Sequence, residues 1–182
     1  MNRNLFLLIG FLFFLHNATA QFYYTKNGSV SFFSKSPLQD IEADNNQVIS
    51  VLNVQSGQIE FSLLNHAFHF PKSKMEEDFN DNYIESDTYP RSSFKGILIH
   101  IHEVDFTKDG NYPVAVKGDL TIHGITKNIT ANGFIHISKG TISASSSFSI
   151  SVNDYGIKIP TIVSHKIAEK IEIQVNCDFQ KK

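Results

Sequence analysis

The chain has 182 residues, a formal net charge of −2 and 41% apolar side chains, with sixteen phenylalanines and no tryptophan. A charge this mild, without a basic run, argues against nucleic acid or an anionic membrane surface as the partner. The single cysteine, Cys177, excludes an intramolecular disulfide, and its period-2 register with apolar neighbours predicts a buried, inert thiol. Stability must therefore come from packing.

The first twenty residues have the pattern of a secretory signal peptide. Arg3 gives a positive start, Leu5 to Leu15 form an almost unbroken apolar run, and Ala18-Thr19-Ala20 fits a small-x-small cleavage site. We therefore expect residues 1–20 to be removed and residues 21–182 to form one domain, periplasmic or secreted. The mature chain contains no apolar stretch long enough for a bilayer, so no transmembrane segment is expected in it.

Beyond residue 20, most of the chain alternates apolar and polar side chains in runs that end at Gly, Asn or Asp, which is typical of strands joined by tight turns. Short connections such as Lys108–Asn111 and Ser138–Gly140 predict hairpins. The pattern predicts an all-β fold, a single eight-stranded antiparallel barrel with one or two short helices. The expected strands, in chain order, cover residues 29–33, 47–54, 59–63, 94–102, 114–122, 125–137, 142–152 and 171–179.

Two segments break the strand pattern. Residues 72–79 follow a proline, and Met75 with Phe79 at i, i+4 predicts a short amphipathic helix there. A polar loop is expected from Asn80 to Pro90. Residues 160–170 are expected to form one or two helical turns over a barrel end.

The clearest alternation lies in residues 141–152, where one face is apolar or small and the other is almost entirely serine. In a closed barrel the apolar row points inward and the serines face water. Small residues at Ala144 and Ser146 leave space that neighbouring side chains either fill or leave open. The frequent phenylalanines fit both outcomes, as core fillers or as the lining of an elongated cavity. The lining residues that alternation predicts are Val30, Phe32, Ile59, Phe61, Leu98, Leu120, Ile122, Ala144, Phe148 and Ile150.

The segment Gly118–Lys127 is an alternating strand that stops at a glycine and restarts at once as a second strand. Together with Tyr89-Pro90 and Phe94 upstream, it resembles the signature of the YceI-like proteins. Ser29–Phe32 is similar to the first strand of that family, and Asn153–Gly156 to its late motif. The resemblance implies a lipocalin-like barrel, export to the periplasm or beyond, and an isoprenoid or other lipid-like amphiphile as the ligand.

Histidines offer the strongest hint of other chemistry. His100 and His102 lie two apart on an expected strand and so share a face, which suits metal binding if His123 or Glu103 supplies a third ligand. Solvent-facing or hydrogen-bonded histidines are the simpler interpretation, so we expect no metal and no other cofactor. The chain has no G-x-S-x-G, no H-E-x-x-H and no glycine-rich phosphate loop, and we expect no enzymatic activity.

These patterns favour a secreted or periplasmic carrier, or sequestering protein, that buries a lipid-like small molecule in its barrel and performs no covalent chemistry. One alternative is a structural or interaction protein whose barrel is filled by its own side chains and whose loop at residues 80–90 contacts a partner. A second is a metal-dependent enzyme that uses His100 and His102. The fold alone does not separate these hypotheses, because such barrels serve many functions.

Overall fold

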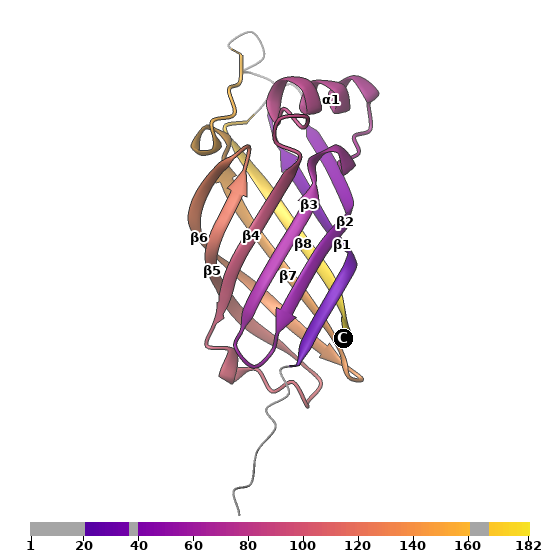
Figure 1. The fold of residues 1–182 in the computed structure, drawn as a ribbon, viewed down its shortest axis with the longest axis vertical. Helices are drawn as coiled ribbons and strands as arrows, with labels where there is room; N and C mark the ends of the chain where they lie inside the picture. Colours follow the sequence, from indigo (N-terminus) through magenta and orange to yellow (C-terminus); the bar gives the residue numbers. More distant parts are fainter. Residues whose placement is uncertain (1–20, 37–39, 161–167) are drawn as a thin grey trace, which may run out of the picture.

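The computed structural model describes residues 21–36, 40–160 and 168–182. In this part of the chain, eight strands form a closed antiparallel barrel in which each strand pairs with the next and β8 pairs with β1 (Figure 1). The eight-stranded meander expected from the alternation is confirmed. The strands are β1 (Phe22–Ser34), β2 (Ile41–Asn53), β3 (Gln58–Leu64), β4 (Arg91–Ile99), β5 (Gly110–Ile122), β6 (Ile125–Ser138), β7 (Thr141–Ser151) and β8 (Lys170–Lys181).

Several strand boundaries differ from the sequence-based expectation. β2 begins at Ile41 rather than at residue 47, and β5 begins at Gly110 rather than at residue 114. β1 begins at Phe22, seven residues before the expected start. The sequence did not reveal this first part, because register shifts between Thr25 and Val30 interrupt the alternation of apolar and polar residues. β4 ends at Ile99, so the prediction that it continues through His102 is wrong. His100 has a φ of 60°, in the left-handed region, and this turns the chain into the 3-10 helix η3 (Ile101–Glu103).

The expected helix after Pro71 is confirmed as α1 (Ser73–Asp78), and it continues directly into the π-helical turn η2 (Phe79–Tyr83). The first residues of the expected loop at 80–90 are therefore helical. Two further 3-10 turns are η1 (Asn65–Ala67) and η4 (Val152–Tyr155). Most of the helical turns expected in residues 160–170 lie outside the described residues. No helix in the described ranges is long and apolar enough to cross a bilayer.

The two ends of the barrel differ. The end that carries α1, at the top of Figure 1, is here called the upper end, and the end that holds the C-terminus is called the lower end. Inward side chains from four strands fill the lower end and are almost completely buried, which confirms the predicted burial of Cys177. They are Leu52, Ile137, Ile142, Cys177 and Phe179.

A pair of glycines makes room for an aromatic ring inside the wall. Gly96 on β4 lies opposite Gly118 on β5, and a Cβ atom on either residue would come within 2.7 Å of the ring of Phe94. Because neither glycine has a side chain, the Phe94 ring can lie flat against both strands. Both glycines are therefore required by packing.

Candidate ligand-binding cavity

The upper part of the barrel encloses a cavity of about 520 Å³, within the range of roughly 300–1,000 Å³ typical of small-molecule sites. Leu98 and Ile135 lie at its lower limit, directly above the filled layer. Inward side chains of all eight strands contribute to the wall, because every second residue of a strand points into a barrel. All ten residues predicted from alternation line this cavity: Val30, Phe32, Ile59, Phe61, Leu98, Leu120, Ile122, Ala144, Phe148 and Ile150. Their contact with a ligand stays a prediction.

Small residues explain why the upper half is hollow. Gly133 on β6 pairs with Ser146 on β7, and both line the cavity beside Ala131 and Ala144. At these positions the wall projects little side-chain volume inward. The lower half is filled instead by leucine, isoleucine and phenylalanine side chains. The question of a filled or a hollow barrel thus has a different answer in each half.

Helix α1 and turn η2 are fastened over the upper end by four phenylalanines. The ring of Phe79 lies 5.6 Å from that of Phe32, 5.5 Å from Phe68 and 5.1 Å from Phe70, measured between centroids. Such aromatic pairs contribute about 0.5–1.5 kcal/mol each beyond simple burial. These four residues, called the aromatic cluster below, attach the helical segment to β1 and to the chain after β3.

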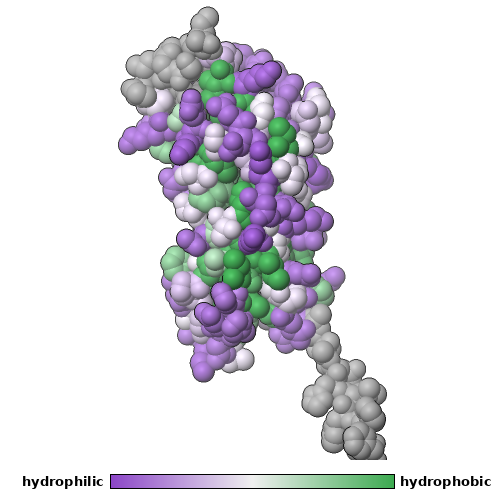
Figure 2. Space-filling view, turned by 90° about the vertical axis from the view of Figure 1, so that its left-hand side faces the viewer, coloured by the Kyte–Doolittle hydropathy of each residue, from purple (hydrophilic) through white to green (hydrophobic). Residues whose placement is uncertain are grey.

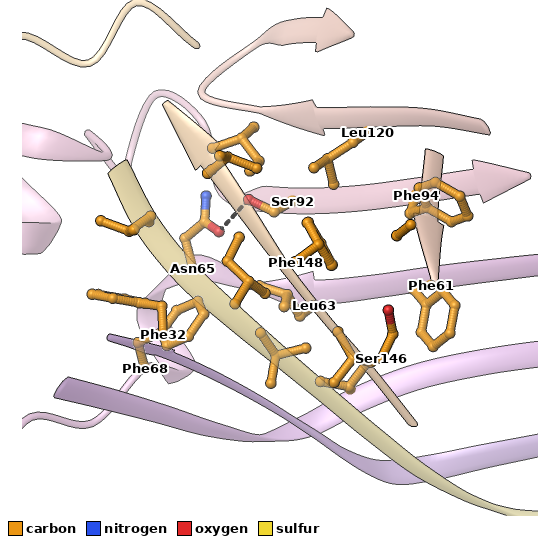
Figure 3. A pocket seen from close by; sticks show the side chains of 18 of the residues that line it. Phe32, Phe61, Leu63, Asn65, Phe68, Ser92, Phe94, Leu120, Ser146 and Phe148 are labelled. Carbon is orange, nitrogen blue, oxygen red and sulfur yellow. Dashed lines mark hydrogen bonds between the residues drawn. The ribbon is translucent and has the colours of Figure 1, made fainter. Parts of the chain in front are cut away.

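The buried polar side chains beside the cavity bond to the protein itself. The Asn65 amide donates a 2.6 Å hydrogen bond to the carbonyl oxygen of Tyr89, and its oxygen accepts a 2.8 Å bond from the Ser92 hydroxyl (Figure 3). With its donor and acceptor both used, Asn65 presents little unmet polarity to a ligand. Alternation gave no signal for this residue, because it follows the end of β3.

Charged residues occur at the upper rim. Lys72 and Lys74 line the cavity there and are exposed. The Lys74 ammonium lies 3.0 Å from a carboxylate oxygen of Asp78 and 3.2 Å from one of Glu77, and the hydrogen bonds to these two groups raise the pKa of Lys74. Exposed ion pairs of this kind contribute little stability. The charge of Lys74 is thus compensated within its own helix.

His123 lies at the upper end, in the two-residue turn between β5 and β6, where it and Gly124 have positive φ angles of 50° and 72°. Its Nε2 atom lies 2.7 Å from Glu85, and its Nδ1 atom lies 3.1 Å from the carbonyl oxygen of Tyr155. His123 therefore connects three segments of the upper end. The hypothesis that it completes a metal site with His100 is wrong, because His100 lies at the lower end after β4.

His100, His102 and Glu103 do come together, with one ligand atom of each within 4.8 Å of the others. The two histidines meet through the η3 turn rather than along a strand face, which corrects the geometry expected from sequence. All three side chains are exposed, and none lines the cavity. Two imidazoles and a carboxylate are suitable ligands for a divalent cation, but this group is remote from the space that could hold a ligand.

The cavity wall is suited to burying apolar groups. Among the described residues, serines line it but no histidine does. One wall hydroxyl, that of Ser146, donates a 2.7 Å hydrogen bond to the carbonyl oxygen of Asn132. Fold and cavity together define the class of small antiparallel barrels that enclose a mainly apolar space.

The family model of the YceI-like domain matches residues 17–179, and this chain belongs to that family. A polyisoprenoid-binding domain from Saccharophagus degradans, implicated in plant cell wall breakdown, superposes with a TM-score of 0.78 at 11% identity, over 90% of this chain and 100% of that domain. BcnA of Burkholderia cenocepacia superposes with a TM-score of 0.70 at 15% identity, over 84% of this chain and 96% of BcnA.

The YCEI protein of Campylobacter jejuni superposes with a TM-score of 0.56 at 15% identity, over 77% of this chain and 84% of that protein. At such identities the similarity establishes the barrel fold. No match is found among curated proteins. The family prediction made from Gly118–Lys127 and its companion motifs is confirmed.

Proposed function

We propose that this protein is a non-enzymatic carrier that holds the apolar chain of an isoprenoid or another lipid-like amphiphile in the upper half of its barrel. The observation that carries the proposal is the apolar cavity of about 520 Å³ above the filled layer. The structural similarity to a polyisoprenoid-binding domain supports it. The signal-peptide pattern of residues 1–20 supports action in the periplasm or outside the cell, with residues 21–182 as the mature domain.

The cavity volume sets the size of the enclosed chain. At roughly 30 Å³ for each water-sized group, 520 Å³ holds about 17 such groups, and a methylene group is of similar size. This corresponds to about three isoprene units or one acyl chain of about 16 carbons. Burial of each methylene contributes about 0.8 kcal/mol, against an association cost of about 4–15 kcal/mol. Most of the chain must therefore be buried for tight binding, and few polar contacts are needed.

The proposal is tested by expressing the full chain in a bacterial host, purifying the exported protein without detergent, and combining native mass spectrometry with solvent extraction. We expect about one prenyl or acyl species per chain, or stoichiometric uptake of added farnesol or palmitate by protein that is isolated empty. Protein that is isolated empty and takes up neither compound would contradict the proposal.

A matched pair of variants tests whether binding occurs in the cavity. Ala144→Phe places a ring in the cavity from the inward face of β7 and should weaken binding of a fluorescent C16 fatty acid at least tenfold. Ser143→Phe adds the same ring one residue earlier, on the outward face that pairs with His136 and Asp178, and should leave the affinity unchanged. Equal affinities of the two variants would mean that the fatty acid binds elsewhere.

A further inference from the structure

The seam between β6 and β7 is paired only in the lower half of the barrel. The last pair is Gly133 with Ser146. Above it, residues 125–132 of β6 pair with β5, and residues 147–151 of β7 pair with β8. No backbone hydrogen bond joins these two stretches to each other in the described part of the chain. Moving these two strand edges apart therefore breaks no backbone hydrogen bond of the sheet.

The gap between these edges is also closed at the top. The carbonyl oxygen of Tyr155, at the end of η4, lies 3.1 Å from Nδ1 of His123. A Cβ atom on Gly156 would lie 2.9 Å from a methyl carbon of Ile125, so the backbone there packs directly on the start of β6. The gap is therefore a window, framed below by the pair Gly133–Ser146, above by η4, and at the sides by β6 and β7.

The cavity reaches the outer surface beside this window. Phe134 and Ser145 form the pair just below its lower frame and are exposed, Phe134 by 47%, yet both line the cavity. Ala131 on β6 and Phe148 on β7, at the two sides of the window, also line the cavity. Figure 2 shows the side of the molecule that carries β5 and β6, and apolar residues run along it in a strip between polar ones.

A similar gap, between β2 and β3, is closed by hydrogen bonds. The upper part of β2 also extends beyond its pairing with β3. There the backbones of Asp44 and His69 exchange hydrogen bonds of 2.8 and 3.1 Å, and Asn45 donates a 2.9 Å bond to the carbonyl oxygen of Leu64. Phe68, which is 6% exposed, packs behind this bridge. Between β6 and β7, the described residues provide one such bond beyond the last pair, from the Ser146 hydroxyl to the carbonyl oxygen of Asn132 at the lower frame of the window, and no bridge above it.

We propose that the β6–β7 window is the route by which an apolar chain enters and leaves the cavity; this rests on the carrier function proposed above. Passage through the window breaks no backbone hydrogen bond, because the facing edges are unpaired. The cavity also borders the exposed Lys72 and Lys74 at the upper rim. Widening that end by moving α1 and η2 would separate the aromatic cluster, at a cost of about 0.5–1.5 kcal/mol for each ring pair, whereas the window needs no such movement.

A bulky label at the edge of the window tests this route. Ser149→Cys, on the outward face of β7, and Thr130→Cys, on the outward face of β6, are both exposed positions for reaction with a large maleimide. Cys177 is 2% exposed, and burial raises the pKa of its thiol to about 12, so it stays unlabelled. The control is Glu60→Cys, an exposed position on β3 where the chain pairs on both sides.

Stopped-flow fluorescence then measures association and dissociation of a fluorescent C16 fatty acid. A label at either edge of the window should slow both rates at least tenfold and leave the dissociation constant within about threefold, because the cavity itself is unchanged. The labelled Glu60→Cys protein should exchange at the wild-type rates. Unchanged rates with the label at both edges would overturn the window as the route and leave the carrier function standing. Wild-type protein that binds no fatty acid would overturn the carrier function itself.

Discussion

Nε2 of His123 lies 2.7 Å from a carboxylate oxygen of Glu85, although 38 residues separate the two in sequence. The other ring nitrogen faces the carbonyl oxygen of Tyr155. A carboxylate and a carbonyl oxygen both accept hydrogen bonds, so both partners of the ring are acceptors. The His123 ring also packs against Tyr89, with 4.4 Å between centroids. The histidine of the best-marked sequence motif therefore has a structural role at the upper end.

A double-mutant cycle measures this contact. His123→Ala, Glu85→Ala and the double variant should show a coupling of about 1 kcal/mol in urea unfolding, because the His123 side chain is only 12% exposed and the bond is charge-assisted. His66 and Asp87 form the control pair, also at hydrogen-bond distance but with side chains 54% and 99% exposed, and should show no measurable coupling. Equal coupling in the two pairs would contradict the structural role of His123.

Gly118→Ala should destabilise the barrel by about 1–3 kcal/mol. A Cβ atom at this position would overlap the carbonyl oxygen of Lys95 and the Cα atom of Gly96, which are backbone atoms, and would come 2.7 Å from the ring of Phe94. Chemical denaturation of the variant measures the loss.

The control for this substitution is Gly140→Asn, in the turn between β6 and β7. There no atom lies within 4 Å of the added Cβ, and asparagine tolerates the φ of 79°. This variant should stay within about 0.5 kcal/mol of wild type. If Gly118→Ala were equally neutral, the close approach of β4 and β5 would not hold in solution.

The Cys177 thiol should be unreactive in the folded protein. Burial, and to a smaller extent the charge of Asp178, raise its pKa from 9.0 to about 12, so the reactive thiolate is scarce at pH 8. Modification by a thiol reagent should be at least a hundredfold slower in buffer than in urea. Similar rates under both conditions would show that the lower end of the barrel opens readily.

The same pKa shift predicts a pH dependence of stability. Below pH about 9 the thiol is neutral in both states, so its contribution is fully present. As the pH rises from about 9 towards 12, the unfolded chain ionises first, and the free energy of unfolding falls. Unfolding of wild type and Cys177→Ala at pH 8, 9 and 10 should show the steeper decline in wild type, and parallel curves would contradict this.

Metal removal should not affect ligand binding. His100, His102 and Glu103 lie at the lower end, and the filled layer separates them from the cavity. Treatment with a chelator, or the double variant His100→Ala/His102→Ala, should leave the affinity for the fluorescent C16 fatty acid within twofold of wild type. A loss of binding in either case would link this group to the cavity.

The sequence alone determined the class of fold and predicted inward residues on five of the eight strands. Side chains alternate with period 2, so a run such as Ile142–Val152 shows which residues face the interior before any partner strand is known. This is why all ten predicted lining residues lie on the cavity wall. The alternation failed where the backbone left the extended conformation, at the Thr25–Val30 register shifts and at His100, because local composition does not reveal either change.

Only the tertiary structure decided where the barrel is hollow and where its wall opens. The cavity depends on small residues of different strands meeting at Gly133 and Ser146. The window depends on where the pairing of β6 with β7 stops, and the role of His123 depends on Glu85, 38 residues away in sequence. All three arise from contacts between residues distant in sequence. A local pattern of apolar and polar residues carries no information about such contacts.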